Sequence, residues 1–525
     1  MIRRGWAARG TLLAALCLGL AACALPPDGL SAARTPGTSD SSTTPNSSAA
    51  LAGTGARPEA PSIDALAKNK RLNFRTCLEY ALRQNLKVEI AQLGTTSAAQ
   101  GEKVARAKFD PFIGLTGVGY PGDGLSMNAT QGNAVVSQKF ITGTEIRAEA
   151  GTAFFNNSDR SLGYVSDQTE AAIRLRQPLL RGAGIAVNRA GMDLAKITTK
   201  NADATERAEV MEMLRATITA YWTATWAKEA LRVQRESLGR SERILQDVNS
   251  RHAIGAATKI DRLEAESAVA AAKEQVERAE QRNQDALSNL TYLLGLTPGD
   301  APTDISLEAL VIPVVASPKP ETSYQNALIR NPMEVLLANE VERRTIERRV
   351  AKNALLPGLD LEINTGTSGL FGYDQGTSSS SSSTNNGNDS ANWSALLRVS
   401  IPWTFRAERA QAEQTRIELE RSEIAREDGR RQLRRDIFET CREIESGRRQ
   451  LDTAMQALSV NRAKWEEQSI RLKEGLVSVR DLCEAEGEFQ NASVRELSAR
   501  LGIIIARARL ARLDGSIVER NGMTF

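Results

Sequence analysis

The sequence predicts a mainly α-helical protein that also carries membrane β-strands and is built from an internal duplication. The landmarks of residues 85–295 recur in the same order in residues 331–515, and so long a repeat indicates an architecture. Two stretches without proline, residues 186–250 and 405–470, would each form a helix about 100 Å long at about 1.5 Å per residue. Between the helical stretches, short segments alternate apolar and charged residues, as strands do.

The first residues predict export from the cytoplasm and a lipid anchor. Residues 1–22 have a basic start and an apolar stretch that is too short to span a bilayer, which is typical of a signal peptide. The closing Leu-Ala-Ala-Cys resembles the lipobox of bacterial lipoproteins, in which cleavage leaves Cys23 as the lipid-bearing first residue. Ala24 then resembles the pattern for sorting to the outer membrane. Ordinary cleavage that leaves Cys23 unmodified is the alternative.

The rest of the chain divides into a tether, two repeats and a tail. Residues 23–70 are rich in Pro, Gly, Ser and Thr and predict a flexible tether. We expect the first repeat at residues 71–300, a linker at 301–320, the second repeat at 321–515 and a C-terminal tail at 516–525. Besides the two long helices, shorter ones are expected at residues 74–108, 258–294, 323–355 and 478–513. Two short helices laid end to end would match one long helix in length, which suggests paired coiled-coil columns.

Four strands are expected, two in each repeat. They follow Pro111, precede Pro178, follow Pro357 and precede Pro402. In the second of them, Ile173 and Leu175 share one face while Arg174 and Arg176 share the other. Such alternation suits a membrane barrel with lipid outside and water inside, although a soluble sandwich could also show it.

The first repeat also contains an extra segment, residues 122–169, with another alternating stretch at 144–150 that is consistent with an additional hairpin. Four strands cannot close a barrel, because the smallest barrels have eight. An open edge in lipid would leave backbone groups unpaired at a cost of several kcal/mol each. Several chains must therefore share one barrel.

Composition excludes several classes of function. The net charge of +3 is too balanced to indicate a nucleic-acid partner. His252 is the single histidine, so neither a multi-histidine metal site nor histidine acid–base chemistry is available. The sequence has no phosphate loop or nucleophile elbow, so we expect no catalytic residue, metal or cofactor. Cys77, Cys441 and Cys483 lack metal-ligand spacing and are expected to be buried apolar side chains, with a disulfide between two of them as the alternative.

The chain resembles the TolC-like outer-membrane efflux protein family over residues 72–515. The motifs are Leu356-Pro357 before a strand, Gln177-Pro178-Leu179-Leu180-Arg181-Gly182 after one, and two helix turns at residues 251–261 and 471–481. Each turn is followed by Leu263-Glu264-Ala265-Glu266 or Cys483-Glu484-Ala485-Glu486. The resemblance implies a homotrimer with one twelve-stranded barrel in the outer membrane, continued by a coiled-coil tunnel through the periplasm. It implies docking to a periplasmic adaptor that joins an inner-membrane pump, and no enzymatic activity.

The two turns would form the periplasmic tip of the tunnel. Gly255 and Gly475 permit the left-handed conformation that ends a helix, and Thr258 and Ser478 can cap the next helix. The resemblance implies adaptor docking at these turns.

The acidic residues after the turns have two possible roles. Asp261 and Asp481 stand in the first helical turn, where the helix dipole favours negative charge. The resemblance instead implies that carboxylates at Asp481 and Glu484, with Asp261 and Glu264, narrow the entrance as a gate. The chain departs from the family where Val477 replaces a basic gate residue, and Arg480 is the candidate substitute.

Two alternatives stay open from the residues alone. A periplasmic adaptor also has a lipobox and a coiled-coil hairpin, but a duplicated long helix suits it poorly. A structural coiled-coil lipoprotein without a pore would leave the charged alternating strands unexplained. The sequence does not name the transported substrate.

Overall fold

The computed structural model describes residues 73–120, 128–156, 164–296, 318–374 and 390–521. The expected signal peptide, Cys23, the tether and most of the linker at 301–320 lie outside these ranges. The described chain divides into two compact units. Unit 1 holds residues 100–196 and 343–419, and unit 2 holds the remainder.

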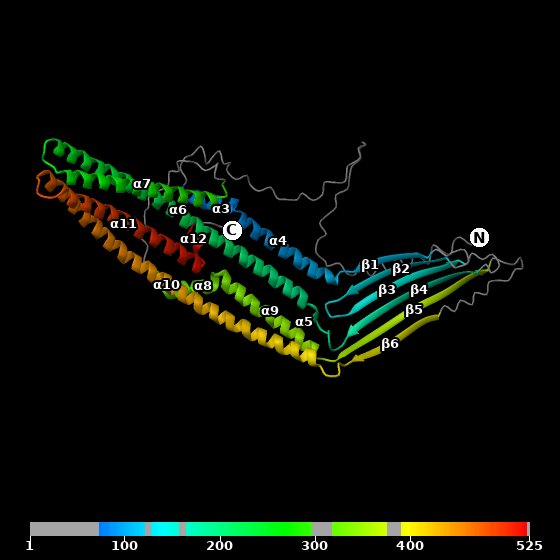
Figure 1. Ribbon diagram of the computed structural model, residues 1–525. Coiled ribbons are helices and arrows are strands. Elements are labelled where there is room, and N and C mark those ends of the chain that lie inside the picture. Colours follow the sequence, from blue (N-terminus) through cyan, green and yellow to red (C-terminus); the bar gives the residue numbers. More distant parts are fainter. Residues whose placement is uncertain (1–72, 121–127, 157–163, 297–317, 375–389, 522–525) are drawn as a thin grey trace, which may run out of the picture. The chain divides into compact units, whose positions relative to one another are not determined.

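Unit 1 contains one antiparallel sheet in which the strands follow one another in chain order, from β1 to β6 (Figure 1). The strands are β1 (Phe112–Tyr120), β2 (Asn128–Lys139), β3 (Glu145–Asn156), β4 (Tyr164–Pro178), β5 (Gly358–Asp374) and β6 (Ser390–Ser400). The four expected strands are β1, β4, β5 and β6. The additional hairpin is β2 and β3, and it lies within the sheet between β1 and β4. The predicted four strands per chain are therefore corrected to six in the described part of the chain.

The sheet has one charged and one apolar face, as the alternation predicted. Arg176 of β4 stands opposite Glu145 of β3, and its neighbour Leu175 stands opposite Ile146. Because neighbouring residues of a strand point to opposite faces, these two pairs lie on different sides of the sheet. On the apolar side, Leu115 is 81% exposed, which a face turned toward lipid would explain.

The helices reproduce the two repeats. They are α3 (Phe74–Gln84), α4 (Leu86–Arg106), η1 (Ala107–Phe109, a 3-10 helix), α5 (Ile185–Asn188), α6 (Ala190–Ala253), α7 (Lys259–Leu293), α8 (Pro320–Arg330), α9 (Pro332–Ala354), α10 (Arg406–Lys473), α11 (Val479–Leu513) and α12 (Ile517–Arg520). The two long helices, α6 and α10, are continuous as predicted. No helix within the described ranges has an apolar stretch that could cross a bilayer.

The expected helices at residues 74–108 and 323–355 are each broken in two, which corrects the prediction. Each break is an asparagine that bonds in two directions. The side chain of Asn85 accepts from the backbone N–H of Lys87 at 2.9 Å and donates to the carbonyl of Leu293 at 3.2 Å. Its first bond caps α4, and its second one ties the break to the end of α7.

The second repeat has the same device. Asn331 accepts from the N–H of Met333 at 2.8 Å and donates to the carbonyl of Leu513, at the end of α11, at 2.9 Å. Gly515 then follows with φ of +74°, where a Cβ atom would lie 2.5 Å from Cβ of Arg330. A glycine is required at this close approach. Short helices therefore meet at their ends in both repeats, as the length comparison predicted.

The core of unit 2 is built from the helical stripes that the sequence predicted. Val210, Leu214, Ile218 and Tyr221 of α6 recur at steps of three and four and are all buried. The predicted C-terminal tail begins with a packed helix, since α12 buries Ile517 in the same cluster. Three cysteines are free thiols, of which Cys77 and Cys441 are buried and Cys483 is partly buried; none of the three forms a disulfide.

Candidate functional site at the paired helical turns

Both long helices end in the same turn. Beyond α6, Gly255 has φ of +75°, and the N–H of Ala256 donates to the carbonyl of Arg251 at 2.8 Å. Beyond α10, Gly475 has φ of +74°, and the corresponding bond has a length of 3.0 Å. This pattern closes a helix with a left-handed residue and satisfies its last carbonyls. Both glycines therefore have the left-handed conformation that the sequence predicted for them.

The next helices begin with capping boxes. Thr258 Oγ1 accepts from the N–H of Asp261 at 3.1 Å, and the Asp261 carboxylate accepts from the N–H of Thr258 at 2.8 Å. Ser478 and Asp481 form the same pair of bonds at 3.2 and 3.1 Å. These reciprocal bonds satisfy N–H groups that the helix itself leaves unpaired.

The caps also hold the two aspartates in the charged form. The pKa of Asp261 lies below its ordinary value, chiefly because the Thr258 hydroxyl donates to the carboxylate. The pKa of Asp481 is lowered in the same way by Ser478, and to a smaller extent by the nearby charge of Arg480. The capping role of both carboxylates is therefore observed directly. Glu484 is exposed and Glu264 is partly exposed, so their carboxylates reach the surface of the turns.

A buried cluster and one hydrogen bond hold the two turns together. Val248 of α6, Ala265 of α7 and Leu482 of α11 pack in a common core with Leu472 and Val479. The guanidinium of Arg251 donates to the carbonyl of Leu472 at 2.6 Å. This bond joins the end of α6 to the equivalent end of α10. The spacing of the motifs did not predict it.

Large apolar side chains remain exposed around the same turns. Ile254, directly after α6, is 79% exposed, and Leu476, three residues after the end of α10, is 70% exposed. Ile260 and Leu263, in the first turns of α7, are also exposed. Exposed apolar side chains gathered at one place are typical of a surface that binds another protein.

The two repeats differ in one acidic residue of the motif. Glu266 is exposed and pairs with Arg262 at 3.5 Å. Glu486 is only 3% exposed and accepts hydrogen bonds from Ser237 at 2.9 Å and from Arg240 at 2.8 Å. Burial raises the pKa of the Glu486 carboxyl although Arg240 lies against it. Burial likewise raises the pKa of the neighbouring Cys483 thiol to about 11.

The guanidinium of Arg240 also stacks on aromatic rings. Its central carbon lies 5.0 Å from the ring centre of Phe489 and 5.6 Å from that of Trp465. A charge pair with so many partners fixes how α6, α10 and α11 pack, and it offers no free group for chemistry.

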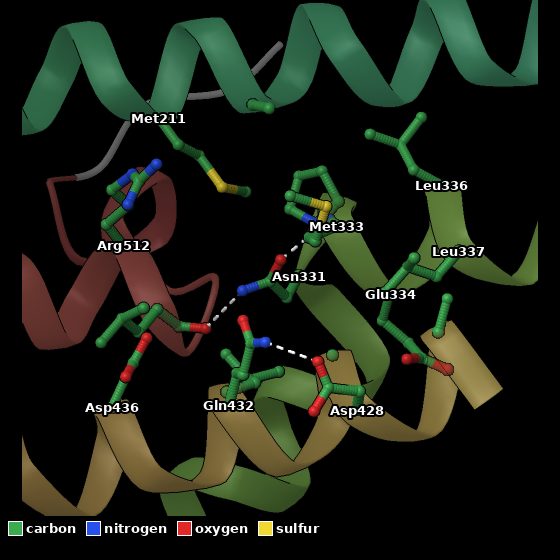
Figure 2. A pocket seen from close by; sticks show the side chains of 16 residues that line it. Met211, Asn331, Met333, Glu334, Leu336, Leu337, Asp428, Gln432, Asp436 and Arg512 are labelled. Carbon is green, nitrogen blue, oxygen red and sulfur yellow. Dashed lines mark hydrogen bonds between the residues drawn. The ribbon is translucent and has the colours of Figure 1, made fainter.

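A hollow of about 410 Å³ lies beside the Asn331 break and is lined by α6, α9, α10 and α11. Figure 2 shows the side chains that line it. Its polar side chains bond to neighbouring residues of the protein. Glu334 accepts from Arg426 and from Arg430, each at 2.7 Å. Gln432 donates to Asp428 at 2.6 Å (Figure 2). The hollow is therefore a packing gap at a helix junction. In the described part of the chain, no group of His, Cys, Asp and Glu side chains could hold a metal ion.

A comparison with known families decides what these repeats belong to. The family model of the outer membrane efflux protein matches residues 77–296 and 323–516, which are the two repeats. The chain belongs to the outer membrane efflux protein family. No curated protein matches it significantly.

Solved structures share the fold of this efflux protein at low sequence identity. VceC of Vibrio cholerae is 14% identical with a TM-score of 0.63, over 87% of this chain and 99% of its own. MtrE of Neisseria gonorrhoeae is 16% identical with a TM-score of 0.62, over 86% and 91%. CmeC of Campylobacter jejuni is 13% identical with a TM-score of 0.62, over 92% and 94%.

The efflux protein is thus an outer-membrane channel of tripartite efflux systems, and it extends into the periplasm. Channels of this family form trimers within those complexes and are transport proteins, not enzymes. The predicted fold class and the predicted channel function are confirmed. The two alternatives, an adaptor and a structural lipoprotein without a pore, are set aside by the family match.

Proposed function

We propose that three copies of this chain form one barrel and act as the exit duct of an export complex. The edges of the sheet support the homotrimer. Within the described residues, β1 pairs only with β2, and β6 only with β5, so each has one edge without a strand partner in the chain. Such edges are costly in lipid unless β1 of one copy pairs with β6 of the next.

A trimer is tested on the full-length chain in outer-membrane extracts. We expect a species of three times the chain mass on mild gels, and it should convert to the monomer on heating. A protein that leaves the membrane in salt washes and migrates as a monomer would contradict the shared barrel.

The turns at Gly255, Thr258, Gly475 and Ser478 are the proposed docking site for a periplasmic adaptor, which in turn contacts an inner-membrane pump. The exposed side chains of Ile254 and Leu476 support this assignment, because apolar anchors carry much of the binding energy in protein interfaces.

Docking is tested with the double substitution Ile254→Glu and Leu476→Glu. We expect the variant to export less of the compounds that the complex transports. It should also crosslink less to the adaptor, which mass spectrometry identifies in the native host, while the trimer persists. Ile329→Glu serves as the control, since Ile329 of α8 is also large, apolar and 78% exposed. An equal loss in the control, or loss of the trimer, would remove docking as the explanation.

We also propose that Asp481 and Glu484, with Asp261 and Glu264, form the gate at this tip. The spacing of three between Asp481 and Glu484 supports this, since it places both on one face of α11. Three copies would repeat them as a ring that favours cations. Cys23 is the proposed lipid anchor in the outer membrane, motivated by the lipobox-like residues before it.

A further inference from the structure

The hairpin β2–β3 is paired with a further strand on both sides, β2 over most of its length and β3 over all of it. β1 pairs with β2 from Phe112 opposite Ser137 to Tyr120 opposite Ala129. β3 pairs with β4 through all twelve of its residues. Without the hairpin, β1 and β4 would be antiparallel neighbours, so the hairpin adds two strands to the sheet and keeps its topology.

The hairpin repeats the two-faced pattern of the other strands. On β3, Arg147 and Glu149 lie on the charged face, and Ala148 and Ala150 on the opposite one. On β2, Asn133 stands opposite Gly151 on the charged face, and Ala134 stands opposite Ala150 on the apolar face. A segment resting on top of a sheet would not have to follow this alternation.

Ion pairs cross from the hairpin to the other strands on the charged face. Lys139 of β2 pairs with Glu145 of β3 at 3.1 Å, and Glu145 lies 3.9 Å from Arg176 of β4. Arg176 pairs in turn with Asp360 of β5 at 3.3 Å. This series of ion pairs therefore joins four neighbouring strands, β2 to β5, near the end of the sheet from which the helices leave.

The inner turn of the hairpin is built into the same end. Gly143 has φ of +95°, and a Cβ there would lie 2.8 Å from the carbonyl oxygen of Gly182 and 2.9 Å from Pro178. The N–H of Gly184 donates to the carbonyl of Thr142 at 3.2 Å. The turn is thus fitted against the segment that leaves β4.

From these observations we infer that the hairpin is part of the barrel wall, so that a trimer closes an eighteen-stranded barrel. This inference rests on the proposed trimer. With strands spaced by about 4.8 Å and tilted by about 40°, eighteen strands give a backbone diameter of about 36 Å, against about 24 Å for twelve. The cross-section is roughly twofold larger, and barrels of 16–18 strands enclose an open water-filled channel.

The wide barrel has a consequence for the cargo. The lumen is lined by both signs of charge, including Lys139, Arg147, Glu145 and Glu149 of the hairpin. Such an exit passes bulky solutes of either charge, so selection by size falls to the helical tip and to the other components of the complex.

The first test counts strands and uses a shortened chain as the comparison. Electron cryomicroscopy of the full-length trimer in nanodiscs should show eighteen strands and a barrel about 36 Å wide. A variant in which a short turn replaces residues 121–163 should form a trimer with twelve strands and a narrower barrel. A full-length trimer with twelve strands in its wall would overturn the inference and leave the exit-duct proposal intact. Absence of any trimer would overturn the proposed function as well.

The second test does not depend on the shortened chain folding. Asn133→Cys and Ala134→Cys place thiols on neighbouring positions of β2 that face opposite ways. A charged, membrane-impermeant maleimide added to proteoliposomes should label Asn133→Cys through the lumen and leave Ala134→Cys unlabelled, with the parent chain as background. Equal labelling of both would place the hairpin outside the wall.

Discussion

Two aspartates at the tip carry a role that the structure shows and a role that is proposed. Asp261 and Asp481 complete the capping boxes of α7 and α11. The proposed gate needs only the negative charge of Asp481 and Glu484, whereas the cap needs a hydrogen-bond acceptor of the right shape. An amide keeps such an acceptor and removes the charge, so the two roles can be separated.

We predict that Asp481→Asn with Glu484→Gln lowers cation selectivity in planar-bilayer recordings of the trimer. Up to six carboxylates would lose their charge, and their attraction for cations is strongest at low salt. Thr258→Ala is the matched control, because it weakens a cap of the tip and leaves every carboxylate in place. Unchanged selectivity in a correctly assembled double variant would assign both residues to structure alone.

The caps also predict a pH dependence. The folded-state pKa of both aspartates lies below the ordinary value of 3.8, so the charged cap stabilises the turns fully above that value. This stabilisation is lost as the pH falls from about 3.8 through the lowered pKa. Hydrogen exchange at the starts of α7 and α11, corrected for intrinsic rates, should therefore accelerate over this range. Ser478→Ala should weaken the effect at α11 only; an identical pH profile at α11 would contradict it.

At the scale of elements, the tip depends on two glycine turns. Gly255→Ala and Gly475→Ala each place a side chain at positive φ, at a cost of about 1 kcal/mol. We predict lower export with the trimer still assembled, measured by compound sensitivity and mild gels together. Gly239→Ala within α6 is the control: it has open space around it and helical geometry, so it should be neutral or stabilising. Loss of assembled trimer in proportion to export would indicate a folding role.

The sequence predicted the long helices, the capped turns and the faces of the strands, because each follows from local pattern. It missed the breaks at Asn85 and Asn331, although both were landmarks of the duplication. Residues 74–108 contain no proline, so local pattern favours one helix. The break is set by Leu293, which is 208 positions away from Asn85. Likewise, alternation at residues 144–150 indicated a hairpin, but its place between β1 and β4 follows from pairing that is not local.

Glu486 shows the same limit at the tip. Glu266 and Glu486 occupy equivalent positions of the four-residue motif, so the sequence predicts the same environment for both. Glu486 alone is buried, because Arg240 binds it and packs against Phe489. Equivalent positions in a duplicated sequence predict the same backbone conformation. The surroundings of each side chain depend on the helices that pack against it.

At the scale of the whole molecule, the proposed lipid at Cys23 adds an attachment to the barrel. A diacylglyceryl group carries two acyl chains, and dual acylation gives stable membrane anchoring, so the lipid would hold the chain in the membrane in addition to the barrel. We predict that mass spectrometry finds a diacylglyceryl-modified Cys23 at the mature N-terminus. Cys23→Ser should reduce the yield of membrane-bound protein while some export persists. A mature N-terminus that starts elsewhere without lipid would contradict the anchor.

The meandering order of the strands also shapes how the protein is made. Five pairings build the sheet, and four of them join strands that are consecutive in the chain with no helix between them. The pairing of β4 with β5 is the exception: it must wait for residues 185–354, which lie between the two strands. Local pairs form sooner than distant ones, because less chain entropy is lost in closing them. The first four strands can therefore assemble as a half-sheet while the second repeat is still being made. The edge at β4 then needs protection from aggregation until β5 pairs with it, and the edge at β1 needs protection until the trimer forms.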